Sequence, residues 1–516
     1  MTFTVRLTII YLTLRLKLFR SGFYPKIDMD IKKTLSYEDF GAIGDGINND
    51  FDAIIACHEE ANRTGTPVKT KDGATYYIGG ENKSAIINTD VDFGKSKFII
   101  DDRKLEKITS YVFIIASPNP EYEIKIDSLS KNDKYLDIPH EGDLYVRVFD
   151  ENKNIFIRKG LNVNAGTAKT DCFILRDDGS IYPSLDWDYE NVTHAVARSC
   201  NELPITVKGG IFTTIANEEE SFYRYHQRGI LIKRAHVVVE GFEHYVENEK
   251  DHGAPYHGFI RSEMSYDVIV RNAIVTPRFT YYTVSRGDPN KLVPMGSYDL
   301  SFWSSIDVKC ENIKQTIDIT NSKYWGVYTS NFCKNLCIEN CIFSRFDAHQ
   351  GVTNAYIKNC TLGHQYIRLI GHGEFVIEDS KIINDKRSFL SLREDYGSLW
   401  DGNITIKNCE WHSTKQQENY SIISQGNEGD HDYGYTCIMA RDVVIDGFTL
   451  YNGADTPAEQ TNFAALDDCQ GANPTLPYPY VTPKTLTMAN VNAENGAECV
   501  PTYAPQNHKD LVVNFK

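Results

Sequence analysis

Four residues in the second half of the chain have side chains suited to acid–base chemistry: Asp347, His349, Asp299 and Glu394. In glycoside hydrolysis one carboxylic acid protonates the leaving oxygen, while a second carboxylate about 5 to 9.5 Å away activates water or attacks the sugar. Asp299 and Glu394 each stand two repeats of a recurring pattern from Asp347, which would put their backbones roughly 10 Å from it. The spacing predicts Asp347 as an acid or base, with His349 tuning it.

The same region suits a second reaction, elimination from a uronic-acid polymer. There, cations neutralise the substrate carboxylate and a base removes the proton beside it. His349 or Tyr328 is the expected base, and four arginines are the expected cations: Arg261, Arg345, Arg368 and Arg393. Arginines also pair with nearby carboxylates such as Glu263, so their presence alone does not choose a reaction.

Aromatic and histidine side chains nearby suit an extended ligand, which needs a concave site with a few placed polar groups. Trp325 is the expected aromatic platform, and the loop Asp251–His257 offers His252 and Tyr256 as part of one wall. With Tyr328, Glu263 and the arginines they form the predicted substrate-binding set. The chain has no CxxC pair and the histidine spacing does not demand a metal, so we expect neither a metal site nor a cofactor.

A repeated sequence pattern indicates how the fold brings these residues together. β-favouring residues, then usually a charged residue, are followed by Asn, Asp or Gly in Val268–Asn272, Tyr356–Asn359, Val376–Asp379 and Ile404–Asn408. The shortest intervals between these turn residues are about 19 and 20 residues, which is tight for a β-α-β crossover but enough for one coil of short strands. Asn, Asp and Gly tolerate the left-handed conformation that a sharp turn requires. The repeat predicts an all-β fold, a right-handed parallel β-helix with inserted loops.

In a β-helix, residues at the same position of successive coils form a column on one face. The candidate residues lie about 9 to 15 positions before the repeated turn residue of their coils, where solenoid repeats place one face. We therefore expect a single ionisable face with a groove.

The N-terminal region carries a more specific motif. Tyr37–Asp50 contains Gly44-Asp45-Gly46 and precedes an amphipathic helical pattern from Asp52, and Gly73–Ile78 follows as a strand. This stretch resembles the rhamnogalacturonase/epimerase-like motif of the pectate-lyase-like superfamily of right-handed parallel β-helices, in which a short helix caps the first coil. Phe346–Gly351 resembles a phrase of bacterial β-helix proteins. The resemblance implies a polysaccharide ligand bound along the side of the helix.

The segment Gly371-His372-Gly373 is similar to a short motif of polygalacturonases. The other motifs of that family have no matching form here, so a structural role is expected for His372.

Composition limits the class of partner. The formal net charge is −16, and partners such as nucleic acid and anionic membranes require clustered Lys and Arg, so neither is expected. Five cysteines recur inside strand-like segments and are predicted to be stacked core thiols: Cys310, Cys337, Cys341, Cys360 and Cys409. Free thiols favour a reducing, cytoplasmic compartment over secretion.

The pattern divides the chain into five parts. Residues 1–28 are an N-terminal extension, 29–100 the cap and first coils, 101–205 a β-rich insertion or irregular coils packed on early coils, 206–451 the central coils, and 452–516 a capping tail. Prolines at 474, 477 and 479 argue against central strands in the tail.

Three functions fit this sequence. The preferred one is a glycoside hydrolase that degrades a polysaccharide. The alternatives are a lyase that acts on a uronic-acid polymer and a non-catalytic glycan-binding protein. The partner in each case is a polysaccharide or oligosaccharide, and a homo-oligomer, such as a trimer, is compatible with the fold.

Overall fold

The computed structural model describes residues 34–105, 110–468 and 475–516, and the predicted extension at residues 1–28 lies outside them. Leu35–Lys516 form one compact unit. Among the described residues, no helix combines the length and the apolar character that crossing a membrane requires.

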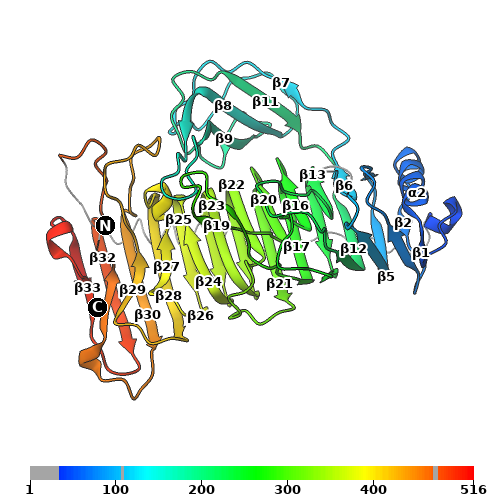
Figure 1. The fold of residues 1–516 in the computed structure, drawn as a ribbon. Helices are drawn as coiled ribbons and strands as arrows, with labels where there is room; N and C mark the ends of the chain where they lie inside the picture. The colour runs from blue at the N-terminus through cyan, green and yellow to red at the C-terminus, as the bar shows by residue number, and fades with distance from the viewer. Residues whose placement is uncertain (1–33, 106–109, 469–474) are drawn as a thin grey trace. The chain divides into compact units, whose positions relative to one another are not determined.

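The unit is a right-handed parallel β-helix, as the repeat predicts (Figure 1). Within the described residues, 27 strands form one continuous sheet that winds through successive coils. Each full coil has three short strands, and strands at the same place in successive coils pair in parallel to give three faces, which we call A, B and C.

Face A begins each coil and carries most of the predicted site. Its strands are β4 (Ala85–Ile87), β6 (Phe113–Ala116), β13 (Ile230–Lys233), β16 (Ile260–Glu263), β20 (Leu300–Trp303), the start of β22 (Tyr328–Glu339), the centre of β23 (Ile342–Lys358), the end of β24 (Thr361–Leu369), β27 (Ser388–Leu392), β29 (Asn419–Ser424), β31 (Asn462–Leu466) and β33 (Cys499–Thr502).

Face B follows after a corner. Its strands are β2 (Val68–Lys69), the start of β5 (Val91–Asp101) and of β12 (Ile205–Ile215), β14 (Ala235–Glu240), the start of β17 (Tyr266–Val275) and of β21 (Ile306–Gln315), the ends of β22 and β23, β25 (Gly371–Glu378), the starts of β28 (Trp400–Ser413), β30 (Asp442–Tyr451) and β32 (Thr485–Ala493), and β34 (Val512–Phe515).

Face C closes each coil. It consists of β1 (Asp45–Asn49), β3 (Thr75–Ile78), β15 (Glu243–Glu247), β26 (Lys381–Asn384), the starts of β23 and β24, and the ends of β5, β12, β17, β21, β28, β30 and β32.

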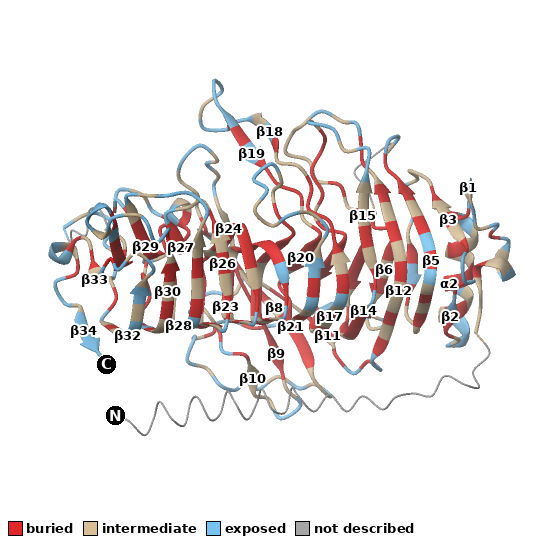
Figure 2. Cartoon of the chain, turned by 90° about the horizontal axis from the view of Figure 1, so that it is seen from below, coloured by how far each residue is buried: buried red, intermediate tan, exposed pale blue. Residues whose placement is uncertain are grey.

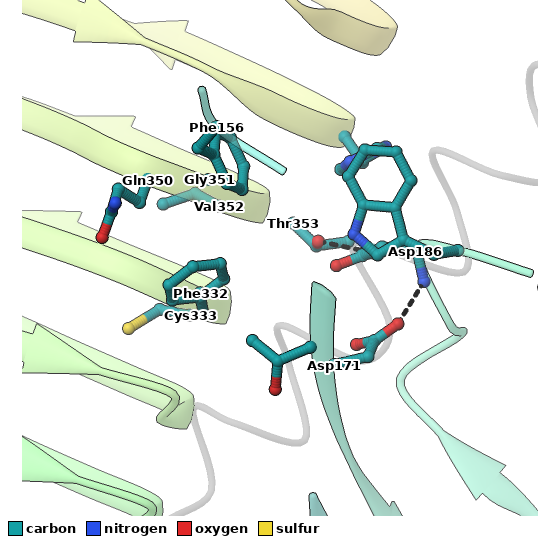
Figure 3. Close-up of a pocket in the computed structure, with 12 residues that line it drawn as sticks. Phe156, Asp171, Asp186, Phe332, Cys333, Gln350, Gly351, Val352 and Thr353 are labelled. Atoms are coloured by element: carbon teal, nitrogen blue, oxygen red, sulfur yellow. Dashed lines mark hydrogen bonds between the residues drawn. The ribbon is translucent and has the colours of Figure 1, made fainter. Parts of the chain in front are cut away.

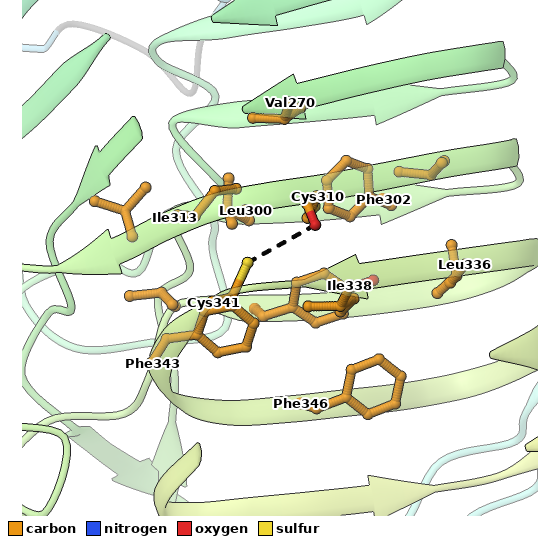
Figure 4. Close-up of a cluster of buried hydrophobic side chains, with 14 of the residues drawn as sticks. Val270, Leu300, Phe302, Cys310, Ile313, Leu336, Ile338, Cys341, Phe343 and Phe346 are labelled. Atoms are coloured by element: carbon orange, nitrogen blue, oxygen red, sulfur yellow. Dashed lines mark hydrogen bonds between the residues drawn. The ribbon is translucent and has the colours of Figure 1, made fainter. Parts of the chain in front are cut away.

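A ladder of apolar side chains runs along the inside of face B. Its rungs pair in register through twelve residues: Val68, Val91, Val207, Val239, Val270, Cys310, Ile338, Ile357, Ile377, Ile406, Ile445 and Met488. All twelve are buried, and Figure 4 shows Val270, Cys310 and Ile338 stacked inside successive coils. Because inward and outward side chains alternate along a strand, this register sets which residues face solvent.

Four of the five predicted core thiols are confirmed as buried and free: Cys310, Cys341, Cys360 and Cys409. The prediction is wrong for Cys337, which is only partly buried because it precedes the inward-facing Ile338 and so points the other way.

The repeated Asn, Asp or Gly occupies the corner between faces B and C. Asn272, Asn312, Asn340 and Asn359 have φ of 55°, 55°, 55° and 51°. The Asn359 amide donates to Oδ1 of Asn340 at 2.7 Å, and the Asn312 amide donates to Oδ1 of Asn272 at 3.1 Å. Asn at this corner therefore has two roles: it tolerates the left-handed backbone conformation, and its amide bonds to the Asn of the preceding coil.

The N-terminal end of the stack is capped by α2 (Phe51–Thr64), preceded by the 3-10 turn η1 (Tyr37–Phe40). The helix buries Phe51, Ile54, Cys57, His58 and Ala61 on one face, as its apolar spacing predicts. Asp50 precedes it and accepts the Ile43 N–H at 2.7 Å, which fastens the Gly-Asp-Gly turn to the helix.

Residues 117–204 form an insertion between β6 and β12. It is a five-stranded antiparallel sheet of β7 (Tyr122–Glu123), β8 (Leu144–Ile155), β9 (Thr167–Leu175), β10 (Ile181–Tyr182) and β11 (His194–Ser199), drawn in cyan and teal in Figure 1. It packs on central coils, not on the early coils that the sequence indicated. Lys334 of face B pairs with Asp171 of the insertion at 2.6 Å, and Trp187 packs edge-on against His372 at 4.6 Å. Contacts between segments far apart in the chain leave no periodic pattern in the sequence, so they could not be predicted from it.

A hairpin of β18 (Tyr281–Val284) and β19 (Leu292–Met295) projects from the loop before β20 (Figure 2). This loop joins face C to face A, so the hairpin and the insertion stand at opposite edges of face A.

The C-terminal part continues the β-helix. β32 pairs with β30 and β34, and β31 with β29 and β33, so residues 452–516 contain further coils and not only a capping tail. The segment also holds the short 3-10 turns η3 (Ala458–Gln460) and η4 (Pro505–Asn507). The prolines misled because Pro477 and Pro479 lie in the loop before β32, outside any strand, while Pro474 is outside the described residues.

Candidate functional site

Face A brings several of the predicted residues into neighbouring rungs. Arg261 pairs with Ser301 in the next coil, and Asp347 pairs with Arg368, which pairs with Ser391. The register therefore places Arg261, Asp347 and Arg368 on one face, with the uncharged Ser301 and Ser391 beside them.

Alternating charges link this column to the insertion. Asp347 accepts hydrogen bonds from Arg345 and, at 2.6 Å, from Nη1 of Arg393. Arg393 also donates from Nη2 to Asp395 at 2.9 Å, and Asp395 is paired with Arg158 of the insertion at 2.5 Å. This chain of five charges ties three separate segments together.

Asp347 lies in the middle of that chain and is 0% exposed. Burial opposes its ionisation, but Arg345 and Arg393 outweigh burial and hold the pKa of its carboxyl well below the usual range. A carboxylate that is permanently ionised and enclosed by two guanidiniums does not donate a proton near neutral pH. This differs from the exposed acid or base that the sequence predicts, since Asp347 positions the arginines instead.

Four side chains around Asp347 carry buried hydrogen-bond donors that find no acceptor among the described residues. They are Nε and Nη1 of Arg345, Nε of Arg158, Nε of Arg368 and Nε1 of Trp325. The Arg345 guanidinium lies over the Trp325 ring at 4.3 Å. Four of these five unmet donors belong to guanidinium groups, which is a property suited to an anionic ligand.

His349 is partly buried on face A beside this cluster. Its Nδ1 lies 3.1 Å from Oδ1 of Asn331, and its ring meets Tyr396 edge-on at 5.7 Å. Burial, together with Arg393, lowers the pKa of His349 to about 3. Because an amide oxygen only accepts, Nδ1 carries the proton of the neutral ring and Nε2 is the basic nitrogen.

A second polar group lies on the earlier coils of face A. Arg261 is paired with Glu263, and its Nη1 lies 3.3 Å from Nδ1 of His257 and donates to Ser301 at 3.3 Å. The guanidinium is also stacked over Trp303 at 5.3 Å. Arg261 is thus held by several partners, while Glu263 keeps a fifth of its side-chain surface exposed.

Three predicted site residues lie in the interior. Asp299 is buried, bonded to Nδ1 of His244 at 2.7 Å and to the Thr276 N–H at 2.7 Å. Tyr328 is buried in the apolar core, stacked on Phe346 at 5.2 Å. Asp299 lies in the loop just before β20, and Tyr328 faces inward at the start of β22, so both side chains are enclosed and do not reach the surface of face A.

Tyr256 is likewise enclosed, since it lies beneath the guanidinium of Arg278 at 3.8 Å. Its neighbour His252 is accessible and paired with the exposed Asp251 at 2.8 Å. The loop Asp251–His257 therefore contributes only its outer part to the surface at the edge of face A.

Glu394 occupies the turn η2 (Glu394–Tyr396) immediately after β27 and is exposed. Its carboxyl is nevertheless partly desolvated by the surrounding protein. This burial, with the negative charge of Asp467, raises the pKa of Glu394, and burial likewise raises the pKa of Asp467. Asp467 follows β31, two coils along face A, hence roughly 10 Å away at the backbone.

The adjacent Asp395 behaves oppositely. Burial would raise its pKa, but Arg393 and Arg158 outweigh burial and hold it well below the usual range. Two neighbouring carboxyls whose environments push their pKa values apart are the arrangement that acid–base catalysis uses.

A small cavity lies between the insertion and the β-helix (Figure 3). Its lining includes Asp171, Asp186, Phe156, Gln350 and Thr353, and its volume is about 10 Å³, room for about one water molecule. The cavity is too small for a sugar, so we place no ligand there. Among the described residues, no cluster of three or more His, Cys, Asp and Glu side chains is arranged to hold a metal ion.

Sequence reasoning did not find Arg158, Asp395, Trp303 or Asp467. Arg158 comes from the insertion and Asp467 from the supposed tail, so neither aligns with the repeated turn residue. Asp395, by contrast, was visible in sequence beside Glu394, and only its two arginine partners distinguish it.

No protein-family model matches the chain, and no curated protein matches it. Solved structures do match. The tailspike protein gp49 from Pseudomonas phage LKA1 is 12% identical, with 89% of this chain and 81% of that chain covered and a TM-score of 0.50. The tailspike gp61 of Pseudomonas phage phi297 is 12% identical over 90% and 76% of the two chains, with a TM-score of 0.49.

The tailspike gp54 of Acinetobacter baumannii bacteriophage AP22, solved with a capsular saccharide, is 9% identical over 93% and 79% of the two chains, with a TM-score of 0.49. At such identities the likeness concerns the fold. The chain is a right-handed parallel β-helix protein, and its fold is similar to that of the tailspike protein gp49.

Proposed function

We propose that this protein is a glycoside hydrolase that degrades a polysaccharide bound on face A, with Glu394 as the proton donor. The observation that carries the proposal is the exposed position of Glu394 in the turn after β27, two coils from Asp467, whereas Asp395 and Asp347 are both paired with arginines. Burial and Asp467 also raise the pKa of Glu394. A general acid requires a carboxyl group that is accessible to substrate and whose pKa is raised, so that it carries a proton to donate.

In the proposed reaction Glu394 gives its proton to the glycosidic oxygen as the bond from that oxygen to the anomeric carbon breaks. Water supplies the oxygen that bonds to the anomeric carbon, and Asp467 accepts the proton that the water loses. The backbone separation of roughly 10 Å between the two residues leaves room for that water, as in inverting enzymes. Asp347, Arg345 and Arg393 hold the neighbouring strands and the turn that carries Glu394.

The test is product analysis on plant, algal and bacterial polysaccharides with the parent protein, Glu394→Gln and Asp467→Asn. Loss of a general acid typically reduces the rate about 10²- to 10⁴-fold, and we expect both variants to fall in that range. Glu459→Gln alters an exposed carboxyl on η3, far along the chain from Glu394, and should keep full activity. Full cleavage by Glu394→Gln would refute the assignment.

A second candidate is a lyase acting on a uronic-acid polymer. It is favoured by the unmet guanidinium donors of Arg345, Arg158 and Arg368, and by a His349 that is neutral at physiological pH. In this reaction His349 Nε2 takes the proton beside the sugar carboxylate while the leaving oxygen departs. Elimination creates an unsaturated product that absorbs in the ultraviolet, whereas hydrolysis creates none.

The third candidate, non-catalytic glycan binding, would give retention on a glycan column with no product. We also propose that the chain belongs to the rhamnogalacturonase/epimerase-like group. This is supported by the Gly44-Asp45-Gly46 turn, which Asp50 fastens to the capping helix. A homotrimer is the oligomeric state we would test first, by light scattering.

A further inference from the structure

The loop between β8 and β9, residues 156–166 and here called the strap, leaves the insertion and crosses face A. Its first residue, Phe156, is 1% exposed and packs against Phe332, Tyr396 and Tyr435 with ring centroids 5.5, 6.0 and 5.3 Å away. These partners lie at the corner between faces A and B. The aromatic packing fixes the strap firmly at this end.

Ionic and main-chain bonds extend the attachment at the same edge. Arg158 pairs with Asp395 at 2.5 Å, and Nζ of Lys159 lies 2.6 Å from Asp430. The Ile157 N–H donates to the Tyr433 carbonyl at 3.2 Å. All of these partners follow β27 or β29, on the side of face A where the insertion stands.

The tip of the strap reaches the opposite edge of face A. The Tyr223 hydroxyl donates to Oδ1 of Asn162 at 2.5 Å, and the Leu161 carbonyl accepts from the Gly287 N–H at 3.4 Å and from the Ser285 hydroxyl. Tyr223 precedes β13 and Gly287 precedes β20, so both lie in loops that join face C to face A. The strap therefore spans the width of face A diagonally.

The two ends are held differently. Phe156 is enclosed in aromatic side chains, whereas Leu161 and Val163 at the tip are 43% and 39% exposed and make polar bonds through neighbouring atoms. The tip is thus the part that can be shortened without opening the apolar core.

Asp347 and Arg345 are almost wholly buried although both stand on face A, and Arg158 from the strap forms the far end of their ionic chain by pairing with Asp395. A glycan lying along face A is therefore blocked at the coils of β22, β23 and β24, where the strap crosses the face. Glu394 is exposed and lies beside the fixed end of the strap, because the neighbouring Asp395 pairs with Arg158.

We propose that the strap prevents a polysaccharide from lying continuously along face A, so that the protein engages its glycan at a chain end. This inference rests on the proposed function and specifies the part of the substrate that the site accepts. The terminal sugars lie against the fixed end of the strap, where Glu394 stands, and the rest of the polymer extends over the C-terminal coils. Hydrolysis then releases short products from chain ends.

The test uses a variant in which residues 159–163 are replaced by Asn-Gly. The antiparallel bridge between Arg158 and Asn164 closes the base of this loop, and Asn-Gly is the preferred two-residue turn between antiparallel strands, so the Arg158–Asp395 pair is preserved. Tyr223→Phe, which only removes the hydroxyl that anchors the tip, is a second variant that does not alter the strap itself.

The probes are polygalacturonate, alginate, xyloglucan and a bacterial capsular polysaccharide. For any of these that is cleaved, viscosity is followed against the number of new reducing ends. The parent should lower viscosity slowly for each bond cut and release short products, and the shortened variant should lower it at least several-fold faster. Tyr223→Phe should fall between them. Equal ratios for parent and shortened variant, or internal cleavage by the parent, would overturn the proposal.

Binding supplies the comparison if hydrolysis itself fails. Each polysaccharide is immobilised at equal mass, either intact or shortened about tenfold by partial acid treatment. End recognition predicts about tenfold more parent protein bound to the shortened chains, and no such gain for the shortened-strap variant. Equal capacity of the parent on long and short chains would overturn the strap assignment even where binding is strong, and a parent that is neither retained nor active on any probe would overturn it together with the proposed function.

Discussion

Glu394 and Asp395 are adjacent in the chain, yet the pKa values of their carboxyls move in opposite directions. Burial and the negative charge of Asp467 raise the pKa of Glu394, whereas Arg393 and Arg158 overcome burial and lower that of Asp395. The turn η2 points one side chain toward solvent and the other into the ionic chain. Within one turn, Glu394 is therefore the carboxyl that is more readily protonated, and Asp395 is the one that stays ionised.

The first prediction concerns the pH dependence of cleavage. Glu394 must be protonated to act as an acid, so kcat/KM should fall as pH rises through its pKa. The positive charge of Arg368 lowers that pKa, and Arg368→Met should therefore move the basic limb of the profile to higher pH. Lys381→Met, on face C, is the matched control and should leave the limb in place. A limb that moves to lower pH in Arg368→Met would contradict the assignment.

The second prediction concerns stability. Arg393→Met leaves Asp347 and Asp395 buried with one fewer cation each, and breaking a buried pair typically costs about 3–5 kcal/mol in the free energy of unfolding. Lys381→Met breaks a half-exposed pair with Glu410 and should cost about 0–1 kcal/mol. Urea unfolding followed by circular dichroism compares the two. A similar loss in both variants would show that the ionic chain is not a stabilising element.

The third prediction tests the corner between faces B and C. Asn359 has φ of 51°, so Asn359→Val should destabilise by about 1–2 kcal/mol because a branched side chain is strained there. Asn359→Gly loses the bond to Asn340 but keeps access to the left-handed conformation, and should cost only a few tenths of that. Thermal unfolding midpoints of the two variants measure the difference, and reversed order would mean that the amide ladder matters more than the backbone.

The fourth prediction concerns acid. Burial lowers the pKa of His58 to about 3, so the folded state resists its protonation while the unfolded chain accepts a proton near pH 6.5. Stability should fall as pH drops below 6.5, by about 2 kcal/mol at pH 5 from this residue alone. His58→Gln has no titrating ring, and its stability should depend less on pH than that of the parent. His412→Gln, on the surface, is the control, and a parent-like pH slope in His58→Gln would contradict the prediction.

Much of the fold is predictable from the sequence because a solenoid repeats its constraints. Each coil needs an inward apolar residue such as Ile357 and a left-handed turn residue such as Asn359, and both recur often enough to be recognised. The column of Arg261, Asp347 and Arg368 follows from the same register. Tyr328 shows the limit of that reasoning, because a one-residue uncertainty in a strand exchanges the core side for the solvent side.

The parts that could not be predicted depend on contacts between distant segments. The ionic chain that includes Asp347 ends at Arg158, which is supplied by the insertion far earlier in the chain. Nor does sequence spacing reveal that Asp467 approaches Glu394, because two loops of unequal length separate their coils. Such relationships are set by packing across faces, for which the chain carries no periodic pattern.

The insertion also bears on how the coils separate. In a simple stack each coil is held only by its two neighbours, so the ends can fray independently of the centre. Here the insertion contacts Lys334, His372 and Asp395, which belong to three different coils. The coils bound by the insertion can open only together. Their amide hydrogens should therefore exchange slowly and as one group, whereas those of the terminal coils should exchange earlier and independently.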